Sequence, residues 1–183
     1  MCGMVTDATD ADTCSANSRS CDSTGQCLKV DQQQLMRDAS LGLGGNSEQK
    51  VAQVVSPGAA GNLVEVRLVV SCSPGAAITV QIQGVTSAGA PDGNVLSSRT
   101  IEPGPLPLDT TSMRSIRLTT PLTVSVGKRF SIIAIGPQTD SCGIILGPGG
   151  DTYPGGKSFY DARPEPPGWK ENTADLPFQT LVQ

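Results

Sequence analysis

The chain has 183 residues, enough for one domain with a full core and an appended segment, but few for two independent domains. Its 13 Lys and Arg are set against 17 Asp and Glu with no run of one sign, so we expect neither nucleic acid nor an anionic membrane surface as a partner. No apolar run approaches the roughly 18 residues of a membrane-spanning helix, and the first residues lack the pattern of a secretory signal.

The chain contains no histidine. Ser-His-Asp and Cys-His triads, HExxH metalloprotease sites and His-ligated transition metals all need an imidazole, so these classes are excluded. We therefore expect no catalytic residues and no enzymatic activity. One alternative stays open, because carboxylate pairs hydrolyse glycosides and their separation cannot be read from sequence. The carboxylates concerned are Asp161, Glu165, Glu171 and Asp175.

Residues 1–30 form a Cys-rich N-terminal segment with little apolar material for a core of its own. Four of the six cysteines, Cys2, Cys14, Cys21 and Cys27, lie in it. Without histidine or a CxxC pair they predict two local disulfides rather than zinc, and hence an oxidising, extracellular compartment. A lipid anchor on Cys2, which precedes Gly3, is an alternative, although it would leave an odd number of thiols.

Residues 31–48 are polar and Gly-rich and predict a linker that leads into a β-domain over residues 49–183. From Lys50 onward, apolar residues recur with a period of two, as in half-buried strands. The expected strands are 49–55, 62–72, 77–84, 94–101, 114–120, 122–126, 128–136, 141–147, 157–162 and 177–183.

The alternation assigns faces to these strands. Val64, Val66, Leu68, Val70 and Cys72 are predicted to face the core, as are Ile78, Val80 and Ile82. The "SPGA" turn predicts that these two strands form a hairpin. "FSIIAI" is apolar on both faces and predicts a central strand.

This density of short strands without a helical pattern predicts an all-β fold, an antiparallel β-sandwich of jelly-roll type with a small disulfide-stapled N-terminal extension. Cys72 ends one inward-facing row and Cys142 opens a later strand. We expect these two cysteines to form a long-range disulfide.

The strand region resembles the β-sandwich accessory modules of large secreted or surface-anchored bacterial proteins. The resemblance covers about residues 50–140 and rests on two turn-and-core motifs. A "G-x-P-x-G-x-V-L" connection is matched by Gly89, Pro91, Gly93, Val95 and Leu96, and a later hairpin by Pro121, Val124 and Gly127, with Phe130 in place of the usual Tyr. It implies a non-catalytic extracellular module and passes on no ligand residues.

Residues 150–169 hold four of the six aromatic residues in a Gly/Pro-rich context. Aromatic rings beside charged groups are typical of polysaccharide-binding modules, because sugar rings stack on them. We therefore expect a ligand site with Tyr153, Tyr160 and Trp169 as stacking residues and Asp161 and Arg163 as polar partners. The alternative is that the rings close the core, which we expect for Phe159 and Phe178.

Two other segments have features of binding sites. "DTYPGGKS" falls one glycine short of a phosphate-binding loop, and Pro154 and Asp151 oppose an anion there. No cofactor is expected, but a structural calcium ion stays open as an alternative, since oxygen-rich loops bind hard cations. Its ligands would come from Asp7, Asp10 and Asp12, or from Asp140, Asp151 and Asp161.

The sequence therefore predicts an extracellular binding module, secreted or on the cell surface, that binds a glycan or polysaccharide or serves in surface attachment. The alternative is a structural subunit of an extracellular fibre, sheath or adhesin. Such a subunit would assemble with identical copies by docking its N-terminal arm on an exposed sheet edge.

Overall fold

The computed structural model describes residues 19–21, 27–105, 112–139 and 141–183, and these residues are nearly all in strands or the turns between them. Within these ranges the only helical element is one 3-10 turn, η2 (Gly45–Ser47), and no helix is long and apolar enough to cross a membrane. Cys2, Cys14, Asp7, Asp10, Asp12 and Asp140 lie outside the described residues.

The strands in chain order are β1 (Arg19–Cys21), β2 (Cys27–Gln34), β3 (Ala39–Leu43), β4 (Lys50–Val55), β5 (Gly61–Leu68), β6 (Val70–Cys72), β7 (Ile78–Val85), β8 (Pro91–Ile101), β9 (Arg114–Val124), β10 (Phe130–Ile135), β11 (Cys142–Leu146), β12 (Ser158–Asp161), β13 (Lys170–Glu171) and β14 (Phe178–Val182).

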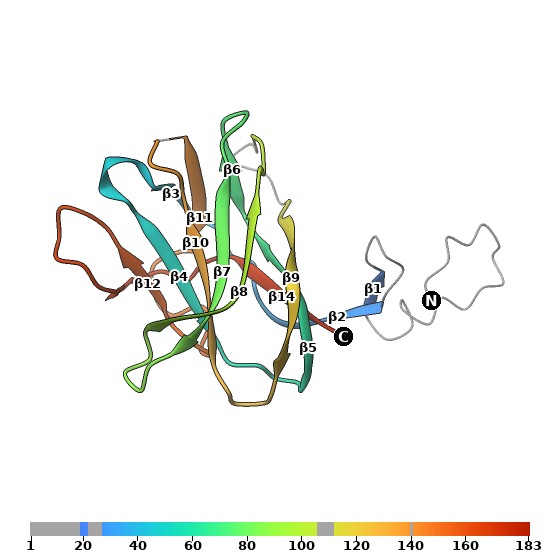
Figure 1. Cartoon of the computed structure of the whole chain (residues 1–183). Helices are drawn as coiled ribbons and strands as arrows, with labels where there is room; N and C mark the ends of the chain where they lie inside the picture. The colour runs from blue at the N-terminus through green and yellow to red at the C-terminus, as the bar shows by residue number, and fades with distance from the viewer. Residues whose placement is uncertain (1–18, 22–26, 106–111, 140) are drawn as a thin grey trace.

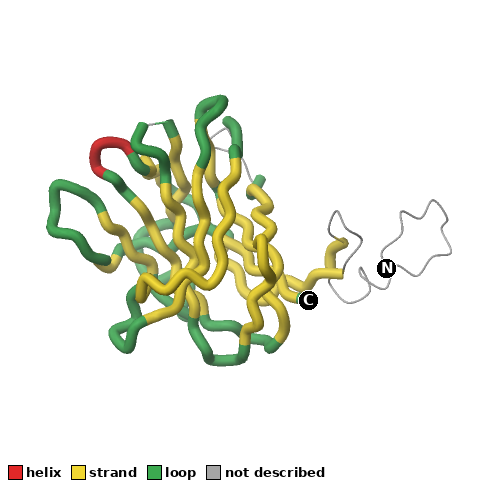
Figure 2. The backbone as a smooth tube through the Cα atoms, viewed as in Figure 1, coloured by secondary structure: helices red, strands yellow, loops and turns green. Residues whose placement is uncertain are grey.

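These strands form three antiparallel sheets, with the orders β1-β2-β14-β5-β9, β13-β12-β4-β10-β7-β8 and β3-β11-β6 (Figures 1 and 2). The third sheet continues the first. In the first sheet β14 lies between β2 and β5, and in the third sheet β11 lies between β3 and β6. Since β3 directly follows β2 in the chain and β6 directly follows β5, the two sheets form one layer. The fold is therefore an antiparallel β-sandwich with two layers.

The core lies between the two layers, and the predicted faces mostly point into it. Ile78, Val80 and Ile82 are fully buried there, as predicted. β10 is buried from Phe130 to Ala134 and pairs on both sides, with β4 and β7, which confirms it as a central strand.

The face prediction is wrong at the start of β5. Leu63 packs in the main core, whereas Val64 belongs to a separate small cluster with Leu28 and Leu181. The pairing of β5 shifts register on both sides of this point, between Leu63 and Glu65 and opposite Leu181 and Val182. A shift of one residue exchanges the faces, so alternation read from the middle of the strand does not extend to its start.

The hairpin predicted around "SPGA" is also wrong. β6 pairs with β11 and β7 pairs with β8 and β10, so the turn carries the chain from one layer to the other. The segment 31–48, predicted to be a linker, instead contains the end of β2, all of β3 and η2. Its strands are the edge of their layer, and Leu43 is buried in the core.

The long-range disulfide is confirmed. Cys72 and Cys142 are direct partners in the β6–β11 pair and are joined at an S–S distance of 2.00 Å. Both lie in the main core, with 2% and 7% of their surface exposed. In the N-terminal segment, the backbone places Cys21 opposite Cys27 in the β1–β2 pair.

Candidate functional site

The aromatic segment belongs to residues 147–177, which leave the first layer and return to it; we call these residues the excursion. β11 ends at Leu146 and β14 begins at Phe178, and both pair along the same neighbours, the β2/β3 and β5/β6 lines. Between them, residues 147–177 cross to the other layer, where β12 pairs with β4 and β13 with β12, and then return (Figure 1). The excursion therefore builds the outer edge of the second layer.

A buried polar network holds this excursion in place. The Asp175 carboxylate accepts hydrogen bonds from the backbone N–H groups of Thr152 (2.8 Å) and Tyr153 (2.9 Å) through Oδ2 and from Gln53 Nε2 (3.1 Å) through Oδ1. Gln53, in β4, also accepts from the Leu176 N–H at 2.9 Å. Both buried polar side chains are thus satisfied, which fixes the two arms of the excursion against β4.

The glycines of "DTYPGGKS" serve packing. The chain turns at Tyr153–Gly156, where the Gly156 N–H donates to the Tyr153 carbonyl at 3.2 Å, with Pro154 at the position that its fixed φ favours. A Cβ on Gly156 would lie 2.1 Å from the Val54 carbonyl oxygen, and one on Gly155 would lie 2.4 Å from the Tyr153 hydroxyl. Close approach to β4 and to the ring therefore accounts for both glycines.

An open groove lies over this network. Its first part has a volume of about 540 Å³, and the side chains on its rim include those of Asp151, Lys157, Glu171, Asn172 and Thr173. A second part of about 360 Å³ adjoins it between the 86–90 turn and the 151–157 loop, and is bordered by Arg129. The two parts share Asp151, Gly156, Lys157 and Glu171. We call these two parts together the polar groove.

The charges of the polar groove differ in how they are engaged. Lys157 and Glu171 form an ion pair with each other, and more than half of each side chain is exposed. By contrast, the exposed Asp151 carboxylate and Arg129 guanidinium have no hydrogen bond or ion pair with the described residues. The groove thus presents an acceptor group and a donor group that a ligand can engage without breaking an internal contact.

Two of the predicted stacking residues face the core. Tyr153 is 5% exposed, packs edge-on against Phe178 with ring centroids 5.0 Å apart, and donates its hydroxyl to Gln32 Oε1 at 3.0 Å. Burial raises the pKa of Tyr153 to about 12; a backbone hydrogen bond at Ser56 opposes this rise, and the nearby charges of Asp31 and Asp175 add to it. Its ring is not exposed for stacking.

The second of these rings, Tyr160, lies opposite Val51 and packs, partly buried, against the same core. The predicted closing role is found for Phe159 and Phe178, which are 7% and 0% exposed. Phe159 belongs to a cluster on the outer side of the second layer with Ala52, Val54 and Ile133.

The other three predicted residues form a structural clasp. Asp161, 5% exposed, binds Lys50 Nζ at 3.1 Å and Arg163 Nη1 at 2.9 Å. Trp169 packs, partly buried, against the outer cluster, and Lys50 Nζ lies 5.3 Å from its ring centroid. The clasp therefore ties the 162–169 loop to β4, and Asp161 and Arg163 engage each other.

We expect Asp161→Asn to lower the free energy of unfolding by about 1–2 kcal/mol at pH 7. Burial disfavours the Asp161 carboxylate, but hydrogen bonds from Lys50, Gly168 and Arg163 outweigh it, so the pKa of Asp161 lies below its ordinary value. Such a carboxylate stabilises the fold above its unfolded-state pKa of about 4, and this is lost as the pH falls through the folded pKa. The difference in unfolding free energy between the variant and the natural protein, measured by urea unfolding, should therefore become smaller below about pH 4.

The exposed pair Lys170–Glu165 provides the control for this experiment. Glu165→Gln should change the free energy of unfolding by less than about 0.5 kcal/mol, because exposed ion pairs contribute little. If the difference in unfolding free energy between Asp161→Asn and the natural protein stayed the same down to pH 2, the role assigned to the clasp would be contradicted.

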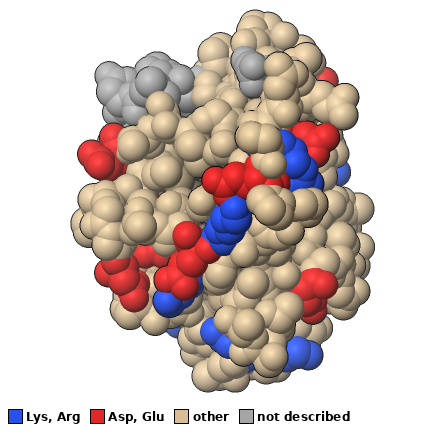
Figure 3. Space-filling view, turned by 90° about the vertical axis from the view of Figure 1, so that its left-hand side faces the viewer, with Lys and Arg blue, Asp and Glu red and all other residues tan. Residues whose placement is uncertain are grey.

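The described residues contain no set of ligands for a calcium ion. Among them, no group of three or more His, Cys, Asp or Glu could hold a metal ion. Asp161 is bound by two cations, whereas Asp151 borders the polar groove. On the face seen in Figure 3, acidic and basic side chains lie beside one another without a large area of one sign.

Sequence reasoning missed Arg129, Asn172 and Thr173 as members of the site. Arg129 lies in the turn before β10, and nothing in the sequence relates that turn to residues 150–175. Asn172 and Thr173 follow β13, a strand of two residues whose pattern is too short to detect.

No protein-family model, no curated protein and no solved structure matches the chain.

Proposed function

We propose that the protein is a non-catalytic extracellular binding module and that it holds a glycan in the polar groove. The observation on which the proposal depends is the unengaged pair of Asp151 and Arg129 on the rim of an open groove with a rigid polar floor. Sugar hydroxyls both donate and accept, so they suit a groove that offers carboxylates and cationic donors together.

Other ligand classes fit this groove less well. A nucleotide or another phosphorylated ligand would meet two carboxylates, Asp151 and Glu171, beside the two cations. An apolar ligand would leave these charges buried without partners, which costs free energy. The proposal therefore moves the ligand site from the aromatic rings to the charged rim beside them.

We also infer that the sandwich is a jelly roll. When β2/β3, β5/β6 and β11/β14 are counted as one strand each, the described residues form eight long strands, with layer orders 1-8-3-6 and 2-7-4-5. Two Greek keys wound together produce this arrangement. The order supports the resemblance to secreted bacterial modules, and the Cys72–Cys142 disulfide supports an oxidising compartment.

A glycan array with the full chain, followed by titration of any retained glycan, tests the main proposal. We expect Asp151→Asn and Arg129→Gln each to weaken binding at least about tenfold, because each removes a charged hydrogen-bonding group worth roughly 1.5–3 kcal/mol. Neither should change the melting temperature, since neither side chain has an internal partner among the described residues.

Arg99→Gln and Glu102→Gln are matched controls, because both residues are exposed and lie outside the polar groove. Binding by these variants should equal that of the natural protein. The proposal would be refuted if no glycan were retained, or if the groove variants and the controls bound a retained glycan equally well.

A structural subunit of a fibre, sheath or adhesin is the second candidate. The β1–β2 pair favours it, because among the described residues β1 pairs only with residues 27–29 of β2, and this pair lies beside the body of the sandwich (Figure 1). Such a pair offers an attachment point for a neighbouring copy.

A further inference from the structure

The polar groove runs along one end of the second layer. The strands β13, β12, β4 and β10 are antiparallel neighbours, so the end of β13, the start of β12, the end of β4 and the start of β10 lie at that end. The lining of the groove includes a residue from each of these positions: Asn172 after β13, Ser158 in β12, Ser56 after β4 and Arg129 before β10. The groove therefore crosses the strands rather than following one of them.

This course sets the length of the groove. Three strand spacings separate β13 from β10, and at about 4.8 Å each they amount to about 14 Å. A six-membered sugar ring, with bonds of about 1.5 Å, measures only about 6 Å between opposite hydroxyl oxygens. One ring therefore covers less than half of the groove, whereas about three linked rings cover it.

Hydrogen-bonding groups without an internal partner lie at both ends of the groove. The Asn172 N–H donates to the Ser158 carbonyl at 2.9 Å, and the Asn172 Oδ1 accepts from the Thr173 N–H at 2.8 Å. Asn172 Nδ2 has no bond to the described residues, so this side chain is held with its donor hydrogens unused. At the other end the Arg129 guanidinium is likewise unengaged within the described ranges. A ligand that spans the groove can bond to both.

The charges on the rim of the groove balance. Lys157 and Glu171, which border both parts, pair with each other, and the remaining charges on the rim are the Asp151 carboxylate and the Arg129 guanidinium. A chain with a carboxylate on successive sugars would place some of them against Asp151 and Glu171. The rim therefore suits uncharged sugars, whose hydroxyls both donate and accept.

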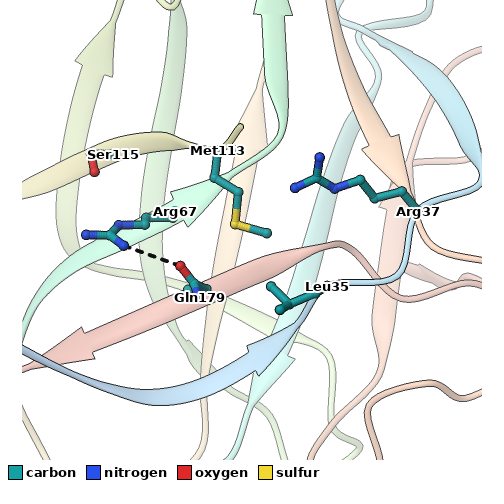
Figure 4. Close-up of a pocket in the computed structure, with 6 residues that line it drawn as sticks. All are labelled: Leu35, Arg37, Arg67, Met113, Ser115 and Gln179. Carbon is teal, nitrogen blue, oxygen red and sulfur yellow. Dashed lines mark hydrogen bonds between the residues drawn. The ribbon is translucent and has the colours of Figure 1, made fainter. Parts of the chain in front are cut away.

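A pocket of about 560 Å³ on the outer side of the first layer, which we call the outer pocket, suits a sugar less well (Figure 4). Arg67 donates to Glu65 at 2.7 Å and to Gln179 at 3.4 Å, and the Ser115 hydroxyl donates to Glu65 at 2.7 Å. Half-exposed Leu35 adds apolar surface. A sugar there would compete with these internal bonds, so the outer pocket provides a control for the polar groove.

We propose that the polar groove binds a stretch of about three sugar units within an uncharged polysaccharide chain, laid across the strand ends from Asn172 to Arg129. This inference rests on the proposed glycan-binding function and names the class of glycan. The outermost contacts are the Asn172 amide and the Arg129 guanidinium, while Asp151 and the Lys157–Glu171 pair bond to the sugars between them. A monosaccharide makes only part of these contacts.

Calorimetric titration of the full chain with size-graded oligosaccharides tests the proposal. The probes are neutral series of one to six units of glucose, mannose, xylose or N-acetylglucosamine and, as an acidic counterpart, oligomers of galacturonic acid. For a neutral series that binds, the affinity should rise at least about tenfold from one unit to three, because each added ring gains hydrogen bonds. From five units to six it should change less than about twofold, since the chain then extends beyond the groove.

Two variants act at opposite ends of the groove. Asn172→Ala should weaken binding of the three-unit probe about fivefold and Arg129→Gln at least about tenfold. In the double variant the two factors should multiply, because the residues lie far apart. For the one-unit probe, no more than one of the two should change the affinity. Thr173→Val is the second variant at the Asn172 end, because it removes only an exposed hydroxyl.

Leu35→Asp in the outer pocket and Asn94→Ala, an exposed residue outside both sites, should bind as the natural protein does, and equal melting temperatures check that every variant folds. A single unit that bound as tightly as three, or galacturonic acid oligomers that bound more tightly than every neutral series, would overturn the inference and leave glycan binding standing. Loss of binding in Leu35→Asp alone would place the sugar in the outer pocket and overturn it too. No binding by any of these probes, together with an empty glycan array, would overturn both.

Discussion

Replacing Cys72 and Cys142 together by alanine is expected to lower the free energy of unfolding by about 4 kcal/mol. The disulfide joins residues 70 positions apart and so restricts a long loop of the unfolded chain. In a chain of this size, the loss corresponds to a fall in melting temperature of roughly 10 °C. Urea unfolding at pH 7 measures it, since the slope against urea concentration also reports the more expanded unfolded state.

The N-terminal cysteines provide the control for this measurement. Chemical reduction of the disulfides in the natural protein should reproduce most of this loss of unfolding free energy. Reduction of the alanine variant should lower its unfolding free energy little further, because only the N-terminal segment of that variant still contains cysteines. A loss below about 1 kcal/mol in the double variant would mean that the disulfide adds little beyond the packing of β6 on β11. A large further loss on reduction would assign the stabilisation to the N-terminal segment.

Patterns within one strand could be read from the sequence. The alternation of Ile78, Val80 and Ile82 predicted the inner face of β7, and the unbroken apolar run of β10 predicted its central place. The disulfide followed from the same logic, since Cys72 ends an inward-facing row. Each of these inferences depends on the two-residue period of a strand and needs no knowledge of its neighbours.

Pairing between distant segments could not be read in this way. β2 has the sequence "CLKVDQQQ", in which three glutamines hide the strand pattern. Two of these glutamines are hydrogen-bonded to a strand almost 150 positions away. Gln33 accepts from Gln179 at 2.9 Å, and the Gln32 N–H donates to Thr180 at 3.0 Å. A polar edge strand therefore resembles a linker until its partner is known.

The candidate site shows the same limit. The sequence places Tyr153, Tyr160 and Trp169 in one Gly/Pro-rich segment, but the structure turns the two tyrosines inward and packs Trp169 on the outer cluster. This placement of the rings depends on the hydrogen bond from Gln53 to Asp175, two residues that are 122 positions apart in the chain. That contact positions residues 147–177, and the charged rim of the groove depends on their position. The rim could therefore be identified as a candidate site only from the structure.

Replacing Phe178 by alanine should cost about 3–5 kcal/mol of unfolding free energy, because this fully buried ring leaves a cavity at the centre of the core. Tyr153→Phe should cost only about 1 kcal/mol, since it keeps the ring contact and loses the hydrogen bond to Gln32. The half-buried Trp169→Ala should fall between them. Urea unfolding of the three variants gives this order.

An alkaline absorbance titration shows independently whether Phe178 buries Tyr153. In the natural protein, Tyr153 should ionise near its pKa of about 12, and its neutral form stabilises the fold below pH 10, a contribution lost as the pH rises toward 12. With Phe178→Ala the ring gains access to water, so the pKa of Tyr153 should move back toward 10. If the ring titrated near pH 10 in the natural protein, or if Phe178→Ala cost less than about 1 kcal/mol, the aromatic segment would not close the core, and stacking by Tyr153 would again become tenable.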